Sequence, residues 1–126
     1  MVVVDTSAWI EWIDDGLMAE TVRELLPARH DCVVPTIVQL ELAKWLTREA
    51  TDLSRNATLA YLSRCIVAPM DTEIAFLAAE FCATAKLSTA DAIIYATATH
   101  YGADLLTCDG HFKDLPRVVY VAKRAA

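Results

Sequence analysis

The sequence has few of the residues that interrupt regular structure. Its 126 residues include 3 glycines and 4 prolines, which excludes a fibrous protein or a chain dominated by loops. Hydrophobic residues make up 56% of the chain, which excludes extensive disorder. A chain of this length buries roughly two-thirds of its unfolded surface. We therefore expect residues 1–126 to form a single domain with its own core.

The sequence also lacks a long apolar segment. The apolar residues 2–4 are stopped by Asp5 and carry no basic region or cleavage signal, so we expect no secretory leader. The best internal stretch, residues 90–98, contains Asp91 and is far shorter than the roughly 20 residues of a membrane-spanning helix. These features predict a cytoplasmic protein that makes no membrane contact.

No pattern of cysteine and histidine indicates zinc. The cysteines form no C-x-x-C pair, and the histidines do not complete a zinc motif. We interpret the cysteines as reduced, small and mostly buried side chains. The residues concerned are Cys32, Cys65, Cys82, Cys108, His30, His100 and His111.

Basic residues are in the minority. The chain has 11 Lys and Arg against 17 Asp and Glu, which gives a formal net charge of −6. This balance argues against a protein that coats nucleic acid through bulk positive charge. It remains compatible with a nucleic-acid enzyme that binds metal cations at its site.

Short apolar runs alternate with helical patterns along the chain. Because the apolar runs are continuous, they favour parallel strands buried on both faces, and we predict an α/β fold with a mostly parallel sheet. Thr36 and Gln39 form a capping-box pattern with Thr36 at the N-cap. The expected strands are 2–4, 32–34, 66–67, 105–107 and 118–121, and the expected helices are 6–13, 17–26, 36–49, 54–64, 72–81 and 88–98.

Four acidic residues fall where ligand sites gather in such sheets. Asp5 directly follows the first strand, and Asp109 follows the strand at 105–107. Asp91 lies in the first turn of a helix, and Glu41 lies in the second turn of another. Ligand sites form at the carboxyl ends of parallel strands, so we expect these four acids to converge on one rim.

Each acid also has a simpler interpretation. Asp91 fits a capping box with Ser88, and Glu41 fits an ion pair with Lys44. Asp109 and Gly110 form a common turn dipeptide. The prediction therefore depends on the joint placement. Clustered carboxylates repel one another, and a divalent cation relieves that repulsion. Oxygen ligands favour Mg²⁺ or Mn²⁺, which can activate water for phosphodiester hydrolysis.

Four segments carry a resemblance to a known family. They are VVDTSA (3–8), PTIVQLE (35–41), LSTADAIIYATA (87–98) and LLTCDGHF (105–112). In order and spacing they resemble the PIN-domain ribonucleases, and more narrowly the VapC toxins of toxin–antitoxin pairs. The resemblance covers essentially the whole chain. It implies a three-layer α/β/α fold with a five-stranded parallel sheet, and RNA cleavage that depends on Mg²⁺, with Mn²⁺ as a substitute.

The resemblance also implies roles for individual residues. Asp5 and Asp91 would be direct metal ligands, while Glu41 and Asp109 would bind the metal directly or through water. All four would form the catalytic set. The hydroxyls that match supporting positions are those of Ser7 and Thr107.

The implied partners are an RNA substrate, a VapB-like antitoxin and a second copy of the chain. Trp9, Trp12 and Trp45 fit a core role, and the alternative is a groove in which Trp12 or Trp45 receives an antitoxin tail. That tail would reach the acidic pocket with an arginine. Candidate phosphate contacts are Lys44, Arg48, Lys86 and Lys113.

Three other functions remain open. One is a PIN nuclease of RNA processing without an antitoxin, and another is a catalytically silent PIN-like module that binds RNA or protein. The third is a phosphotransfer or phosphatase domain with a nucleophilic Asp5. Its usual second aspartate is replaced by Ser7, which argues against it.

Overall fold

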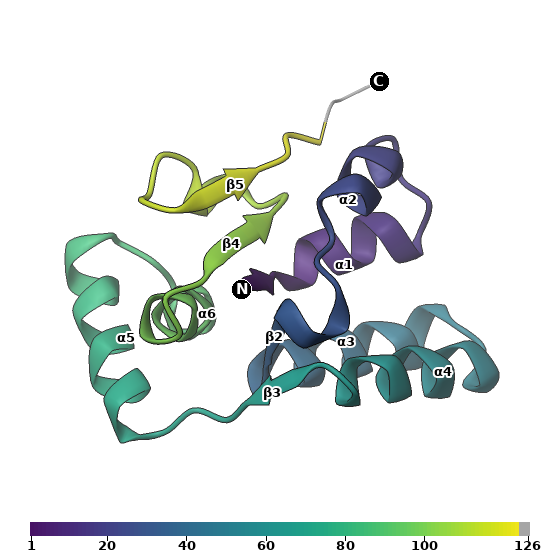
Figure 1. Ribbon diagram of the computed structural model, residues 1–126, viewed down its shortest axis with the longest axis horizontal. Coiled ribbons are helices and arrows are strands. Elements are labelled where there is room, and N and C mark those ends of the chain that lie inside the picture. Colours follow the sequence, from purple (N-terminus) through teal and green to yellow (C-terminus); the bar gives the residue numbers. More distant parts are fainter. Residues whose placement is uncertain (124–126) are drawn as a thin grey trace.

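The structure, a computed structural model, describes residues 1–123 (Figure 1). Within that range the strands are β1 (Val2–Val4), β2 (Cys32–Pro35), β3 (Ile66–Ala68), β4 (Asp104–Thr107) and β5 (Val118–Tyr120). The α-helices are α1 (Thr6–Ile13), α2 (Ala19–Leu25), α3 (Thr36–Glu49), α4 (Asp52–Ser63), α5 (Thr72–Thr84) and α6 (Thr89–His100). Two short 3₁₀ helices are η1 (Arg29–Asp31) and η2 (Gly110–Phe112).

The strands form one parallel sheet in the order β3-β2-β1-β4-β5. The central strand β1 pairs Val3 with Val33 of β2 and with Leu105 of β4. All three side chains are fully buried, which explains why these strands read as continuous apolar runs. The predicted five-stranded parallel sheet is confirmed.

The helices lie on both faces of the sheet. Connections between parallel strands are right-handed, and the chain moves outward from β1 to β3 before it crosses to β4 and β5. This reversal puts α1 to α4 on one face and α5 and α6 on the other (Figure 1). Accordingly, α3 packs on β2 and α4 on β3, while α6 packs on β1, β2 and β4. The three-layer arrangement agrees with the prediction.

Several helix ends differ from the sequence prediction. The predicted capping box with Thr36 at the N-cap is wrong, because Pro35 is the N-cap of α3 and Thr36 is already helical. Pro35 still pairs with β3, so the chain passes from strand to helix without a capping side chain. α4 begins two residues earlier than expected, at Asp52, because Thr51 caps it. α2 begins two residues later, at Ala19.

The helix α5 has the expected cap, because Asp71 Oδ1 accepts the Ile74 amide at 2.9 Å. Gly102 ends α6 as expected, in the left-handed region at φ +61°. No helix in the described range is long and apolar enough to span a membrane.

The strand order fixes where a ligand site can form. β1 is followed in sequence by β2 on one side, whereas β4 lies on its other side. The chain leaves β1 toward one face of the sheet and leaves the neighbouring β4 toward the other. This divergence opens a crevice outside the carboxyl ends of the two strands. Asp5 directly follows β1, and Asp109 lies two residues beyond β4.

Candidate metal centre

Asp5 lies at the floor of this crevice and is 4% exposed. Its backbone amide donates to the Leu106 carbonyl at 2.9 Å, which ties it to β4. Its side-chain Oδ2 accepts hydrogen bonds from Ser7 Oγ at 2.6 Å and from Thr107 Oγ1 at 2.8 Å. Two hydroxyl donors therefore hold this carboxylate in one orientation.

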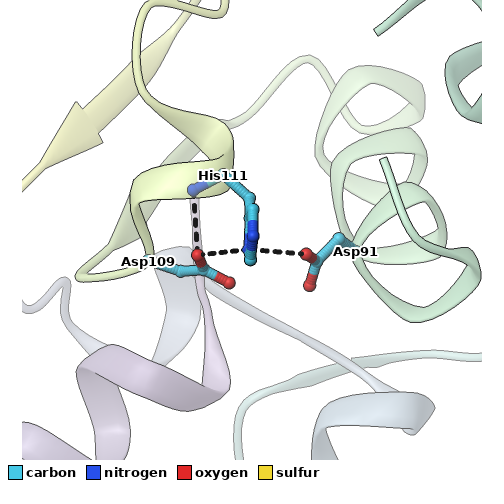
Figure 2. A group of neighbouring side chains, drawn as sticks. All are labelled: Asp91, Asp109 and His111. Carbon is cyan, nitrogen blue, oxygen red and sulfur yellow. Dashed lines mark hydrogen bonds and ion pairs between the residues drawn. The ribbon is translucent and has the colours of Figure 1, made fainter. Parts of the chain in front are cut away.

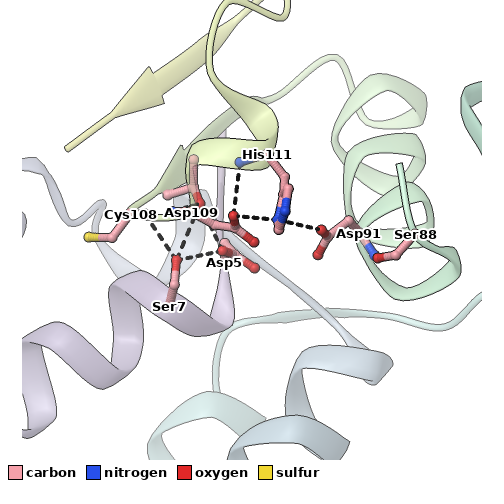
Figure 3. A network of polar contacts seen from close by, with 8 residues as sticks. Asp5, Ser7, Ser88, Asp91, Cys108, Asp109 and His111 are labelled. Atoms are coloured by element: carbon pink, nitrogen blue, oxygen red, sulfur yellow. Dashed lines mark hydrogen bonds and ion pairs between the residues drawn. The ribbon is translucent and has the colours of Figure 1, made fainter. Parts of the chain in front are cut away.

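The same hydroxyls fix the loop that carries Asp109. Ser7 Oγ accepts the Cys108 amide at 3.0 Å (Figure 3). Thr107 Oγ1 accepts the Asp109 amide at 2.9 Å. Each hydroxyl has one proton, and both protons are directed to Asp5. The hydroxyls of Ser7 and Thr107 thus connect the Asp5 carboxylate to the backbone of the loop that carries Asp109.

Asp91 enters the crevice from the first turn of α6. Ser88 Oγ accepts the Asp91 amide at 3.4 Å, so the N-cap that the sequence suggested is present. The Asp91 carboxylate is turned toward His111 and Asp109 (Figure 2). Its Oδ2 lies 3.7 Å from His111 Nδ1, and its side chain is 18% exposed. Capping therefore leaves this carboxylate available to the crevice.

The three aspartates influence one another electrostatically. Burial, with the negative charges of Asp109 and Asp5 adding to it, raises the pKa of Asp91 to about 6. Burial also raises the pKa of Asp5, with Asp109 adding to the effect and the Ser7 and Thr107 hydrogen bonds opposing it. The structure thus brings together Asp5, Asp91 and Asp109 from three distant segments.

Glu41 has a separate position beside this group. Its Oε1 accepts a hydrogen bond from Thr6 Oγ1 at 2.7 Å, and Thr6 is the neighbour of Asp5. The same glutamate lines a hollow of about 260 Å³ together with Lys44, Trp45 and Arg48 of α3. Glu41 therefore stands at the side of the crevice that faces the α1–α3 boundary.

His111 belongs to this group of side chains, although its sequence pattern did not predict a role for it. One ligand atom each from Asp91, Asp109 and His111 lie within 4.8 Å of one another (Figure 2). Zinc-motif spacing does not reveal such a histidine, because its neighbours are carboxylates, one of them from a distant segment. The available signal was its place two residues after Asp109, in a segment already chosen for its aspartate.

The other predicted contacts occupy different places. Lys44 and Arg48 line the hollow with Glu41, whereas Lys86 and Lys113 are exposed. Trp9 is buried, in agreement with a core role, while Trp12 and Trp45 are half-buried and pack against the core.

The cysteines agree with the sequence interpretation. Cys32, Cys65 and Cys108 are buried, and all four cysteines are free thiols. Burial raises the pKa of Cys108 to about 11, so the thiol beside Asp109 is protonated at neutral pH. A thiol in this state is a poor nucleophile.

The donor set fits a hard divalent cation. Carboxylate oxygens are the preferred ligands of Mg²⁺ and Mn²⁺. Burial raises the pKa of Asp91, and the charges of Asp109 and Asp5 add a repulsion that a cation would remove. Such an ion can neutralise charge on a phosphodiester and lower the pKa of a bound water. The arrangement is thus suited to hydrolysis of a phosphate ester.

Comparison with solved structures gives close matches of fold. A toxin–antitoxin complex from Klebsiella pneumoniae contains a chain with TM-score 0.82 and 23% identity, over 94% of this chain and 96% of that one. VapC20 of Mycobacterium tuberculosis, described as a toxin that cleaves the sarcin–ricin loop, has TM-score 0.75 and 20% identity, over 97% and 99%. FitAcB from Neisseria gonorrhoeae has TM-score 0.74 and 22% identity, over 96% and 97%.

The chain matches no curated protein sequence. The sequence profile of the PIN domain, however, matches residues 2–118. That range includes strands β1 to β4, the first residue of β5 and every acid of the crevice. The chain belongs to the PIN domain family.

Proposed function

We propose that residues 1–126 form one PIN-like domain that hydrolyses RNA phosphodiester bonds with Mg²⁺, or with Mn²⁺ in its place. In this proposal the chain is the toxin of a type II toxin–antitoxin pair. The observation that carries the enzymatic part is the convergence of Asp5, Asp91 and Asp109 in one crevice. Burial there raises the pKa values of Asp5 and Asp91, and the neighbouring carboxylates add to the effect. Groups that disfavour their own ionisation in a crevice are typical of functional sites.

Asp5, Asp91 and Asp109 would hold the ion, with Glu41 as a further ligand acting directly or through water. When bound, the ion would supply Lewis acidity and a water of lowered pKa. Ser7 and Thr107 keep Asp5 in one orientation before any ion arrives, because both donate to the same oxygen. Preorganised ligands of this kind reduce the reorganisation that binding requires.

Glu41 would orient the attacking water. Thr6 already holds Glu41 Oε1 at 2.7 Å, so the carboxylate has a fixed direction. During hydrolysis the water oxygen bonds to phosphorus, and the bond from phosphorus to the leaving ribose oxygen breaks. A carboxylate that accepts a hydrogen bond from the water aligns it for this in-line displacement.

The hollow beside Glu41 supports RNA as the substrate. Lys44 and Arg48 line it with the half-buried Trp45 and with Ile10 of α1. Cationic side chains pair with phosphates, and aromatic rings stack on unpaired bases. A single strand that follows α3 would therefore reach Glu41 with its backbone against the basic side chains, despite the net negative charge of the chain.

The proposed partners are an antitoxin and a second copy of the chain. Two of the structural relatives come from VapBC complexes bound to DNA, from Rickettsia felis and Salmonella typhimurium. The half-buried Trp12 is the candidate contact for an antitoxin tail, whose arginine would reach the acidic crevice.

The exposed Leu40 and Met70 share a hollow and are the candidate homodimer contacts. An RNA target of this kind is expected in the cytoplasm.

The test is cleavage of total cellular RNA by the purified chain with Mg²⁺, with Mn²⁺ and with EDTA, beside the Asp91→Asn variant. We expect discrete fragments that require both the metal and Asp91. Circular dichroism of both proteins controls for folding. Cleavage that persists in EDTA or in the variant would contradict the proposed site.

The toxin role has its own measurement. Induced expression of the wild-type chain is expected to stop growth, and expression of Asp91→Asn is not. Cleavage in vitro without growth arrest would favour a nuclease of RNA processing. Metal binding without cleavage by either route would instead favour a silent binding module.

A further inference from the structure

The imidazole of His111 lies between two of the aspartates. Its Nδ1 is 2.8 Å from Asp109 Oδ1 and 3.7 Å from Asp91 Oδ2 (Figure 2). The residue comes from η2, the single turn that follows Asp109. A nitrogen donor therefore stands within reach of the same space as two carboxylates from different segments.

The backbone fixes this position independently of the imidazole. Asp109 is the N-cap of η2, and its Oδ1 accepts the His111 amide at 2.9 Å. Phe112, the next residue, is fully buried and anchors the turn to the core. The side chain of His111 is nevertheless 79% exposed, so it adds little to the packing of the fold. Packing of the core therefore does not require the imidazole to point toward the aspartates.

Two roles fit an imidazole in this position. As a counter-ion, it would neutralise the aspartates and would compete with a cation. As a ligand, it would present the Nδ1 lone pair to a metal that the aspartates also hold. The mutual spacing of the three donor atoms, within 4.8 Å, is that of groups able to share one ion.

On this basis we infer that His111 is a nitrogen ligand of the metal centre and that it shifts the preference of the centre from Mg²⁺ toward Mn²⁺. The inference rests on the proposed metal-dependent function. Mg²⁺ is bound by oxygen ligands and water, whereas imidazole nitrogen suits transition metals. An added nitrogen ligand thus strengthens Mn²⁺ binding more than Mg²⁺ binding.

The test measures metal binding by the full chain, without RNA. Calorimetric titration gives Mn²⁺ and Mg²⁺ affinities for the wild type, His111→Ala and His111→Gln. Loss of the ligand is expected to weaken Mn²⁺ binding by about tenfold or more, with a much smaller change for Mg²⁺. The glutamine variant offers an amide oxygen, so its Mg²⁺ affinity is expected to stay closest to that of the wild type.

His100→Ala is the matched control. His100 also lies beside a carboxylate, with Nδ1 3.5 Å from Glu73 Oε2, but on the C-terminal end of α6. Its replacement is expected to leave both affinities unchanged. Pulsed electron paramagnetic resonance of the Mn²⁺-loaded wild type supplies a direct readout, because a bound imidazole gives nitrogen hyperfine coupling. That coupling is expected to disappear in both His111 variants and to remain in His100→Ala.

The inference would be overturned by any of the following results. Tighter binding of both metals by His111→Ala would identify the imidazole as a competing counter-ion. Absence of nitrogen coupling in the wild type, or absence of Mn²⁺ binding, would exclude His111 as a ligand. RNA cleavage that requires Asp91 while nitrogen coupling is absent would reject this inference alone. Nitrogen coupling in a chain that cleaves no RNA would support the ligand and reject the proposed nuclease.

Discussion

At the scale of single residues, one threonine connects the two sides of the crevice. Thr107 donates to Asp5 and accepts the Asp109 amide, so its hydroxyl links both aspartates. Thr107→Val keeps the shape of the side chain and removes both bonds. We expect metal affinity to fall by about 10- to 100-fold, because the orientation of two ligands is lost. Calorimetric titration with Mn²⁺ measures the change.

The control for this prediction is another buried threonine. Thr97 is 1% exposed and donates to the Ile93 carbonyl at 2.7 Å, within α6 and away from the aspartates. Thr97→Val should lower the free energy of unfolding by about 1 kcal/mol and leave metal affinity unchanged. If both valine variants lose the same affinity, the effect comes from general destabilisation and the link through the Thr107 hydroxyl is rejected.

Asp91 gives a prediction about pH. Its pKa in the folded, metal-free chain is raised to about 6 from 3.8, so the folded state holds this proton more tightly than the unfolded state. The resulting stability is fully present below pH 3.8 and is lost progressively as the pH rises from there through about 6. Asp91→Asn removes the charge. The variant should therefore exceed the wild type in stability at pH 7, on the order of 1 kcal/mol after solvent screening.

Urea unfolding in EDTA at pH 5 and pH 7 measures this difference. The advantage of Asp91→Asn should be larger at pH 7, where the wild-type carboxylate is ionised. Addition of Mg²⁺ should stabilise the wild type and have a smaller effect on the variant. An advantage of equal size at both pH values would show that ionisation of the buried Asp91 carboxylate is not its cause.

The sequence predicted much of this site. Asp5, Asp91 and Asp109 could be selected because each follows a strand or begins a helix, and strand ends and helix starts share an edge. The role of His111 could not be selected in the same way. Its significance depends on Asp91, which is 20 residues away in sequence and meets it only after α6 and β4 have packed.

At the scale of elements, the connection from α1 to α2 depends on a buried glutamate. Glu11 is 8% exposed, and its Oε2 accepts the Met18 amide at 2.8 Å. Gly16 lies against this carboxylate so closely that a Cβ there would displace it. Gly16→Ala should thus cost about 1–3 kcal/mol of unfolding free energy, the price of an unsatisfied buried group.

A double-mutant cycle tests this explanation. Glu11→Ala removes the carboxylate, so Gly16→Ala should cost much less in that background than in the wild type. Thermal unfolding of the four proteins gives the coupling. Additive costs would place the effect of Gly16 in the backbone rather than in its contact with Glu11.

Element boundaries were harder to predict than element types. The start of α4 was missed because its first turn is exposed. Leu53 in that turn is 82% exposed and so does not belong to the apolar face from which the helix was predicted. The capping pattern at Thr36 is present in the sequence, but Thr36 does not cap α3. Pro35, which still pairs with β3, is the N-cap instead. Local patterns identify an element, whereas its end depends on pairing with distant strands.

At the scale of the whole molecule, strand order creates the crevice. The alternation of strands and helices predicted a parallel sheet, but it did not specify that β1 lies between β2 and β4. That order depends on non-local pairing, which single-sequence patterns do not contain. With a different strand order, Asp5 and Asp109 would lie on different parts of the rim. The fold class was therefore easier to predict from periodicity than the meeting of the acids, for which the family resemblance supplied the guide.

An exposed apolar face leads to the last prediction. Leu40 is 59% exposed and lines a hollow together with Met70, Ile37 and Ile93. This hollow lies between α3 and the helix layer on the opposite face of the sheet. Burial of this face against a second copy would remove apolar surface from water. Light scattering after size exclusion should give twice the monomer mass, and Leu40→Glu should give the monomer because an unpaired charge resists burial.

Leu53→Glu is the control for this change of oligomeric state. Leu53 is 82% exposed on α4 and has the same chemistry as Leu40, but it lies outside the shared hollow. Its replacement should leave the dimer intact. The proposed dimer face is rejected if the wild type is a monomer at tens of micromolar, a concentration well above the dissociation constant of a specific interface. It is equally rejected if Leu40→Glu and Leu53→Glu behave alike, because dimerisation would then not depend on this hollow.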